Sequence, residues 1–179
     1  MIMGLEALWQ LHATPLQWAV ALTAATIACV TDLRIRRIPN LLTLPLMISG
    51  PIAWFMIQGP TGLLSSVLGS IVIASPFVVL FVRYGGGAGD AKLMAGIGAL
   101  LGVTSGLFVL FAVVLAGAMF ASIVLITSAL QARRQSAQPS ETHVGPPAEP
   151  IGKKEIPYGV AMCVGTWFAA IGWVIWQWQ

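Results

Sequence analysis

Long apolar stretches separated by short polar or glycine-rich breaks dominate the pattern along this chain. Six stretches predict helices, over residues 16–31, 41–57, 63–82, 92–101, 107–130 and 158–176. Several of them reach the roughly 17–25 residues that a helix needs to cross a bilayer, and a segment in lipid must be helical to satisfy its own backbone. The pattern therefore predicts an all-α, polytopic membrane protein with six transmembrane helices.

The breaks between the stretches complete this prediction. Only Gly-Val-Thr-Ser-Gly at 102–106 separates the fourth stretch from the fifth, and we interpret it as a turn. The fourth helix is then short, so we expect it to sit against its neighbours instead of crossing alone. Residues 131–156 are polar and rich in Pro and Ser, which predicts a flexible cytoplasmic loop. We expect one membrane domain over residues 1–179.

Composition and charge support a membrane location and give it an orientation. The chain is 58% hydrophobic and 8% charged, whereas soluble domains carry about 25% charged residues. Lys and Arg concentrate in cytoplasmic loops, and the six-helix pattern places all the basic residues on one side, which predicts both termini on the other. The net charge is +3, and the basic residues form no continuous stripe along the sequence, so nucleic acid is not an expected partner. The basic residues are Arg34, Arg36, Arg37, Arg83, Lys92, Arg133, Arg134, Lys153 and Lys154.

The residues that commonly bind metals give no pattern. Cys29 and Cys163 lie far apart in the sequence, within apolar stretches, and we expect them to pack as small hydrophobic side chains. The chain has no CxxC pair, and neither His12 nor His143 has a partner at metal-binding spacing. We therefore predict no metal and no other cofactor.

Two aspartates stand at the edges of apolar stretches. Asp32 ends the first stretch and Asp90 begins the fourth, so the predicted topology places both at the cytoplasmic side and at similar depth. Each has an ordinary explanation: an ion pair with the arginines after Asp32, or a favourable helix start at Asp90. Asp32, however, lies at the helix end that disfavours a negative charge. An ionisable residue at the membrane edge is by default a candidate functional group.

A pair of carboxyl groups suggests a definite chemistry. Two carboxyls at short range share one proton, so one can activate a water while the other donates to a substrate carbonyl. This hydrolyses a peptide bond without a metal or a covalent intermediate. The glycines at 85, 86, 87 and 89 allow positive backbone dihedrals and leave room for an extended substrate.

Three motifs carry a resemblance to a known family. Gly-Ala-Gly-Asp at 87–90, followed by Ala-Lys-Leu, resembles the GxGD signature of membrane aspartic proteases. Thr-Asp-Leu-Arg-Ile-Arg-Arg-Ile-Pro-Asn at 31–40 resembles the first motif of the type IV prepilin peptidases. Glu-Ile-Pro-Tyr-Gly-Val-Ala-Met at 155–162 resembles that family's entry to its last helix. The three motifs follow the family order.

The resemblance implies roles for five residues. Asp32 and Asp90 match the two catalytic aspartates, Gly87 and Gly89 match the motif glycines expected at the substrate, and Lys92 matches the lysine that follows, with a role in helix-start electrostatics or docking. Which aspartate acts as the base is left open, because a close pair titrates as a unit.

The resemblance also implies a substrate and a location. Family members cleave prepilins and pseudopilins after a short basic leader, at the cytoplasmic face of the bacterial inner membrane, so the expected partners are a prepilin and the lipid bilayer. Longer members carry a CxxC-containing methylation domain, and nothing in this chain matches it. The chain resembles the short form associated with Flp-type, tight-adherence pili. The cleaved bond, any methylation and the oligomeric state are left open.

Two other interpretations stay open at this stage. One is a different GxGD protease, such as an archaeal preflagellin peptidase or a presenilin-like intramembrane protease. The other is a small transporter or assembly scaffold whose two acids relay protons or bind a cation. A transporter would favour acids near mid-membrane and repeated broken helices, whereas here the acids share one face and no internal repeat is visible.

Overall fold

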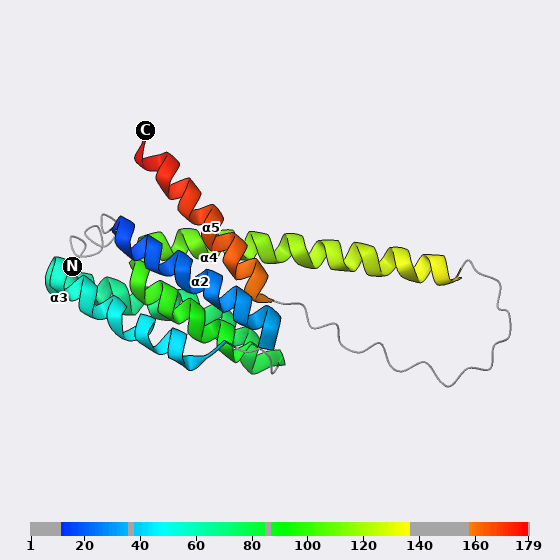
Figure 1. Cartoon of the computed structure of the whole chain (residues 1–179), viewed down its shortest axis with the longest axis horizontal. Coiled ribbons are helices and arrows are strands. Elements are labelled where there is room, and N and C mark those ends of the chain that lie inside the picture. Colours follow the sequence, from blue (N-terminus) through cyan, green and yellow to red (C-terminus); the bar gives the residue numbers. More distant parts are fainter. Residues whose placement is uncertain (1–11, 36–37, 85–86, 137–157, 179) are drawn as a thin grey trace.

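The computed structural model describes residues 12–35, 38–84, 87–136 and 158–178. Within these ranges the chain forms four α-helices and no strand: α2 (Pro15–Ile35), α3 (Asn40–Tyr84), α4 (Ala88–Ser136) and α5 (Tyr158–Gln177) (Figure 1). All four are long and apolar enough to cross a membrane. The all-α fold is therefore confirmed, and the four helices are consistent with a multi-pass membrane protein.

The predicted number of six helices is wrong for the described residues. Stretches 41–57 and 63–82 both belong to α3, and stretches 92–101 and 107–130 both belong to α4. The breaks are shorter than predicted, because a single non-helical glycine replaces each loop: Gly59 in α3 (φ 65°, ψ −147°) and Gly102 in α4 (φ 72°, ψ −174°). Glycine adopts a positive φ at little steric cost, so one residue can change the chain direction.

The glycine in α3 turns the helix back on itself. A side chain at Gly50 would meet the backbone of Ala99 at 2.5 Å, and one at Gly69 would meet that of Gly98 at 2.6 Å. In a straight helix Gly50 and Gly69 would lie about 28 Å apart, yet both approach the same turn of α4. Residues 40–58 and 60–84 are therefore two arms that pack on either side of α4.

The glycine in α4 reverses that helix in the same way. Gly98 and Gly106 lie on opposite sides of Gly102, and a side chain at either would meet Ile73 of α3. The first arm, residues 88–101, runs between its neighbours, as the sequence predicted for the short fourth stretch. The second arm, residues 103–136, turns back and extends beyond the other helices (Figure 1).

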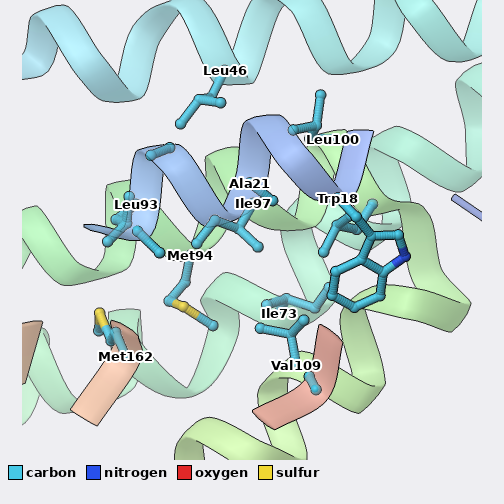
Figure 2. Close-up of a cluster of buried hydrophobic side chains, with 14 of the residues drawn as sticks. Trp18, Ala21, Leu46, Ile73, Leu93, Met94, Ile97, Leu100, Val109 and Met162 are labelled. Atoms are coloured by element: carbon cyan, nitrogen blue, oxygen red, sulfur yellow. The ribbon is translucent and has the colours of Figure 1, made fainter. Parts of the chain in front are cut away.

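The first arm of α4 forms the centre of the buried core. Leu93, Met94 and Ile97 are fully buried there and lie among side chains from all four helices (Figure 2). In contrast, many large apolar side chains on the outer faces are exposed, as expected of surfaces that meet lipid. The most exposed of these on α2 and α3 are Leu16, Leu41, Met56 and Val82.

Side chains of α3 satisfy the backbone groups that the break in α4 would leave without partners. The Trp54 indole N–H donates to the carbonyl of Leu100 at 2.9 Å, and the Ser66 hydroxyl donates to the carbonyl of Ala99. The N–H of Val103 donates to the Ser65 hydroxyl at 3.3 Å. Broken helices are tolerated at membrane depth only where such partners exist, so the two long helices stabilise each other at this point.

The helix α4 extends into residues 131–156, which the sequence predicted to be a flexible loop. The helix α4 continues to Ser136, because the residues after 130 include Gln, Ala and Arg, which favour helix. Residues 137–157 lie outside the described part of the chain.

Candidate functional site

Asp32 lies in the last turn of α2 and is half-buried. Its carboxylate oxygen Oδ2 accepts a hydrogen bond of 3.1 Å from the backbone N–H of Gly159, in the first turn of α5. A helix N-terminus presents free N–H groups that bind carboxylates well. The start of α5 therefore supplies a partner for a charge that the end of α2 disfavours.

Asp90 lies in the first turn of α4 and is also half-buried. Gly87, three residues earlier, has a φ of +86°, and a side chain there would stand 3.1 Å from the Asp90 carboxylate oxygen. Most residue types would be strained in this backbone conformation, and any of them would press on the carboxylate. Gly87 thus permits both the backbone turn into α4 and the position of Asp90.

The fold brings the two aspartates to one end of the helices. The C-terminal end of α2 and the N-terminal end of α4 lie at that end (Figure 1), and the two helices contact each other. Both carboxyl groups therefore lie in the same region of the structure. A pair of carboxyl groups in such an arrangement can share a proton and activate a water.

The other two predicted site residues connect the motifs at the starts of α3 and α4. Lys92 is exposed, and its ammonium group donates to the Asn40 side-chain oxygen at 3.1 Å. Gly89 faces Ile38, since a side chain at 89 would meet the Ile38 Cβ at 3.1 Å. The space beside Gly89 is therefore filled by Ile38, which gives this glycine a packing role. Gly85 and Gly86, also expected to leave room for a substrate, lie outside the described residues.

The interface between α2 and α5 continues away from Asp32 with regular contacts. Cys29 and Cys163, one turn further along each helix, interact with each other, and the Trp167 indole N–H donates to the Thr26 hydroxyl at 3.3 Å. Both cysteines are free and half-buried. Their large separation in sequence concealed this contact, because the pairing of α2 with α5 depends on the tertiary fold.

The sequence alone did not identify Gly159 and Asn40 as site residues. Each stands in a motif that carried the resemblance, Gly159 after Ile-Pro-Tyr and Asn40 after Ile-Pro, so the signal was present as a motif without an assigned role. Among the described residues, no group of three or more His, Cys, Asp or Glu side chains could bind a metal ion.

One comparison with known proteins identifies a family. A family model described as the type IV leader peptidase family matches residues 19–122. The match covers more than half of the chain and includes Asp32, Asp90 and the glycines between α3 and α4. Comparisons with curated proteins and with solved structures gave no match.

Proposed function

Since the chain belongs to the type IV leader peptidase family, which makes it a peptidase whose implied substrate is a prepilin, we propose that it is a membrane aspartic endopeptidase. It removes the short basic leader of a Flp-type prepilin at the cytoplasmic face of the bacterial inner membrane. Both termini of the chain lie on the opposite side of that membrane. Asp32 and Asp90 are its catalytic residues.

The observation that carries this proposal is the position of the two aspartates at one end of the helices. They are 58 residues apart in sequence and belong to separate motifs, yet they lie at the same end of the contacting helices α2 and α4. Both residues are half-buried. A structural ion pair would join an acid to a base, whereas these two groups have the same charge sign. Like charges at short range favour the sharing of one proton, which is the state that acid–base hydrolysis needs.

The proposed reaction needs only the two carboxyl groups and a water. The first carboxyl group, which is ionised, accepts a proton from the water as the water oxygen attacks the scissile carbonyl carbon. The second carboxyl group, which is protonated, donates its proton to the carbonyl oxygen. The tetrahedral gem-diol then collapses: one of its hydroxyl groups returns a proton to the second carboxylate as the new C=O bond forms, the peptide C–N bond breaks, and the departing amine takes the proton from the first carboxyl. The pair returns to its singly protonated state.

The position of the pair at the end of the helices suits this substrate. A prepilin keeps its hydrophobic helix in the bilayer, so the bond after its leader lies where that helix meets the cytosol. The basic residues Arg34 and Arg83 stand near the same ends of α2 and α3, and Lys and Arg mark cytoplasmic ends. A peptidase with its aspartates at this level meets the bond without unfolding the membrane helix.

The direct test is co-expression with a Flp-type prepilin. Cleavage is scored by the size shift on leader removal, and the cleaved bond is identified by mass spectrometry. Asp32→Asn and Asp90→Asn preserve side-chain volume but remove the ionisable group, and we expect neither variant to process the prepilin. Thr61→Ala is a matched control, since Thr61 is exposed and lies two residues after Gly59, where α3 turns back at the end of the structure away from the aspartates. Wild-type processing by either aspartate variant, at equal membrane levels, would refute the proposal.

A further inference from the structure

Gly159 lies in the first turn of α5 and is buried. It stands outside residues 19–122, which the family model matches. Its backbone N–H donates the 3.1 Å hydrogen bond to Oδ2 of Asp32. This is the one hydrogen bond to the Asp32 carboxylate among the residues that the structure describes.

The missing side chain of Gly159 matters as much as its N–H. A Cβ built at this position would stand 2.6 Å from Oδ2, 2.9 Å from Cβ and 3.0 Å from Cγ of Asp32. These three atoms are its nearest neighbours, and all belong to the aspartate. Ordinary contact begins at 3.4 Å, so even a methyl group would push the carboxylate away by nearly 1 Å, or push α5 away from α2.

The contacts further along the interface keep α5 from giving way. Cys29 meets Cys163, and Thr26 meets Trp167, at the next two turns of the helix pair. Gly165 on the same helix lies so close to Val113 of α4 that a side chain there would meet the Val113 backbone at 2.5 Å. The helix α5 is thus packed on two sides, and the Asp32 side chain is the softer element.

We infer that Gly159 is a positioning residue of the active site: the first turn of α5 fixes the Asp32 carboxylate through a backbone N–H and through the absence of a side chain. This inference rests on the proposed function, because it assigns Asp32 to catalysis. It adds α5 to the site as a third structural component, beside the helix ends that bear the two aspartates.

The test compares alanine substitutions at three glycines of α5 in the full-length protein, purified in detergent and assayed with a prepilin. A catalytic group displaced by about 1 Å loses roughly 100-fold in rate. We therefore expect Gly159→Ala to lower kcat by about 100-fold and to leave KM within about twofold, because the substrate is still bound. A merely structural role would lower the amount of folded protein without this split.

Two controls separate positioning from packing. Gly172→Ala adds a methyl group with nothing within 4 Å, and it should match the wild type in kcat, KM and thermal stability. Gly165→Ala forces α5 away from α4 at a distance from Asp32, and it should lower thermal stability. A Gly159→Ala variant with a kcat within twofold of the wild type would overturn the inference.

A double variant covers the case in which Gly159→Ala does not fold. Asp32→Gly removes all three atoms that the new methyl group would meet, so Asp32→Gly/Gly159→Ala should be as stable as Asp32→Gly alone. If the double variant also fails to fold, Gly159 serves packing and the inference is wrong. Wild-type processing by Asp32→Asn would overturn the proposed function itself, whereas an inactive Asp32→Asn with normal Gly159→Ala kinetics would overturn this inference alone.

Discussion

Replacing Gly102 with alanine should lower the free energy of unfolding by about 2–5 kcal/mol. Gly102 has a φ of 72° and a ψ of −174°, a backbone conformation that is essentially restricted to glycine and costs other residues about 1–3 kcal/mol. The new methyl group would also stand 2.9 Å from the Ser65 hydroxyl and 3.0 Å from Trp54. To relieve that overlap, the Ser65 or Trp54 hydrogen bond at the break must stretch or the buried indole must move, at a further cost of about 1–2 kcal/mol.

Two other glycines divide this cost into its parts. Gly59 also has a positive φ, +65°, but a side chain there meets nothing within 4 Å, so Gly59→Ala should cost only the backbone strain of about 1–3 kcal/mol. Gly117 is helical, with no positive φ and nothing within 4 Å. Gly117→Ala should therefore stabilise the protein by about 0.5–1 kcal/mol, since alanine is the better helix former.

The measurement is reversible unfolding of the purified protein in mixed micelles, with the free energy of unfolding compared across the three variants and the wild type. The expected order of stability is Gly117→Ala, wild type, Gly59→Ala, Gly102→Ala. If Gly102→Ala and Gly117→Ala both stabilised the protein, the left-handed break in α4 would not be part of the folded state. Equal values for Gly59→Ala and Gly102→Ala would show that the overlap with Trp54 and Ser65 relaxes freely, which would refute the packing argument.

Two further predictions test contacts around the aspartates. Mild oxidation should form a disulfide between Cys29 and Cys163. After proteolysis between residues 137 and 157, the two fragments should then migrate together on a gel without reductant, and Cys29→Ser is the control. Fragments that separate would contradict the pairing of α2 with α5. Lys92→Met should lose less than about 1 kcal/mol of stability, because its hydrogen bond to Asn40 is exposed, and it should keep most of the processing activity. A 100-fold loss of activity would instead make Lys92 part of the chemistry.

The sequence predicted the aspartate pair because charge is rare in this chain. With 8% charged residues, each acid at the edge of an apolar stretch needs an explanation, and the positions of the basic residues placed Asp32 and Asp90 on one side. The depth of each followed from the lengths of the stretches. This reasoning uses only the lengths of the helices, which follow from the number of residues and the rise per residue.

The breaks in the helices could not be predicted so well. The residues around Gly59 and after Gly102 have turn-forming composition, including Gly, Pro, Thr and Ser, and composition predicted a loop of several residues at each. In the structure, each break is a single glycine with helix on both sides of it. At Gly102 this is possible because Trp54, Ser65 and Ser66 satisfy the backbone groups that the break exposes. These partners come from another helix, and local sequence does not encode them.

The two aspartates differ in how the fold supports them, and this has a functional consequence. Asp90 begins the first arm of α4, which is buried between its neighbours and packed against both arms of α3. Asp32 ends α2, and its carboxylate accepts its hydrogen bond from the first turn of α5, a helix that packs against both α2 and α4. Changes at the α2–α5 interface should therefore move Asp32 relative to Asp90, while the core keeps Asp90 in place. Because the proposed hydrolysis requires both carboxyl groups to reach one water and one peptide bond, we expect the docking of α5 to determine whether the pair is competent.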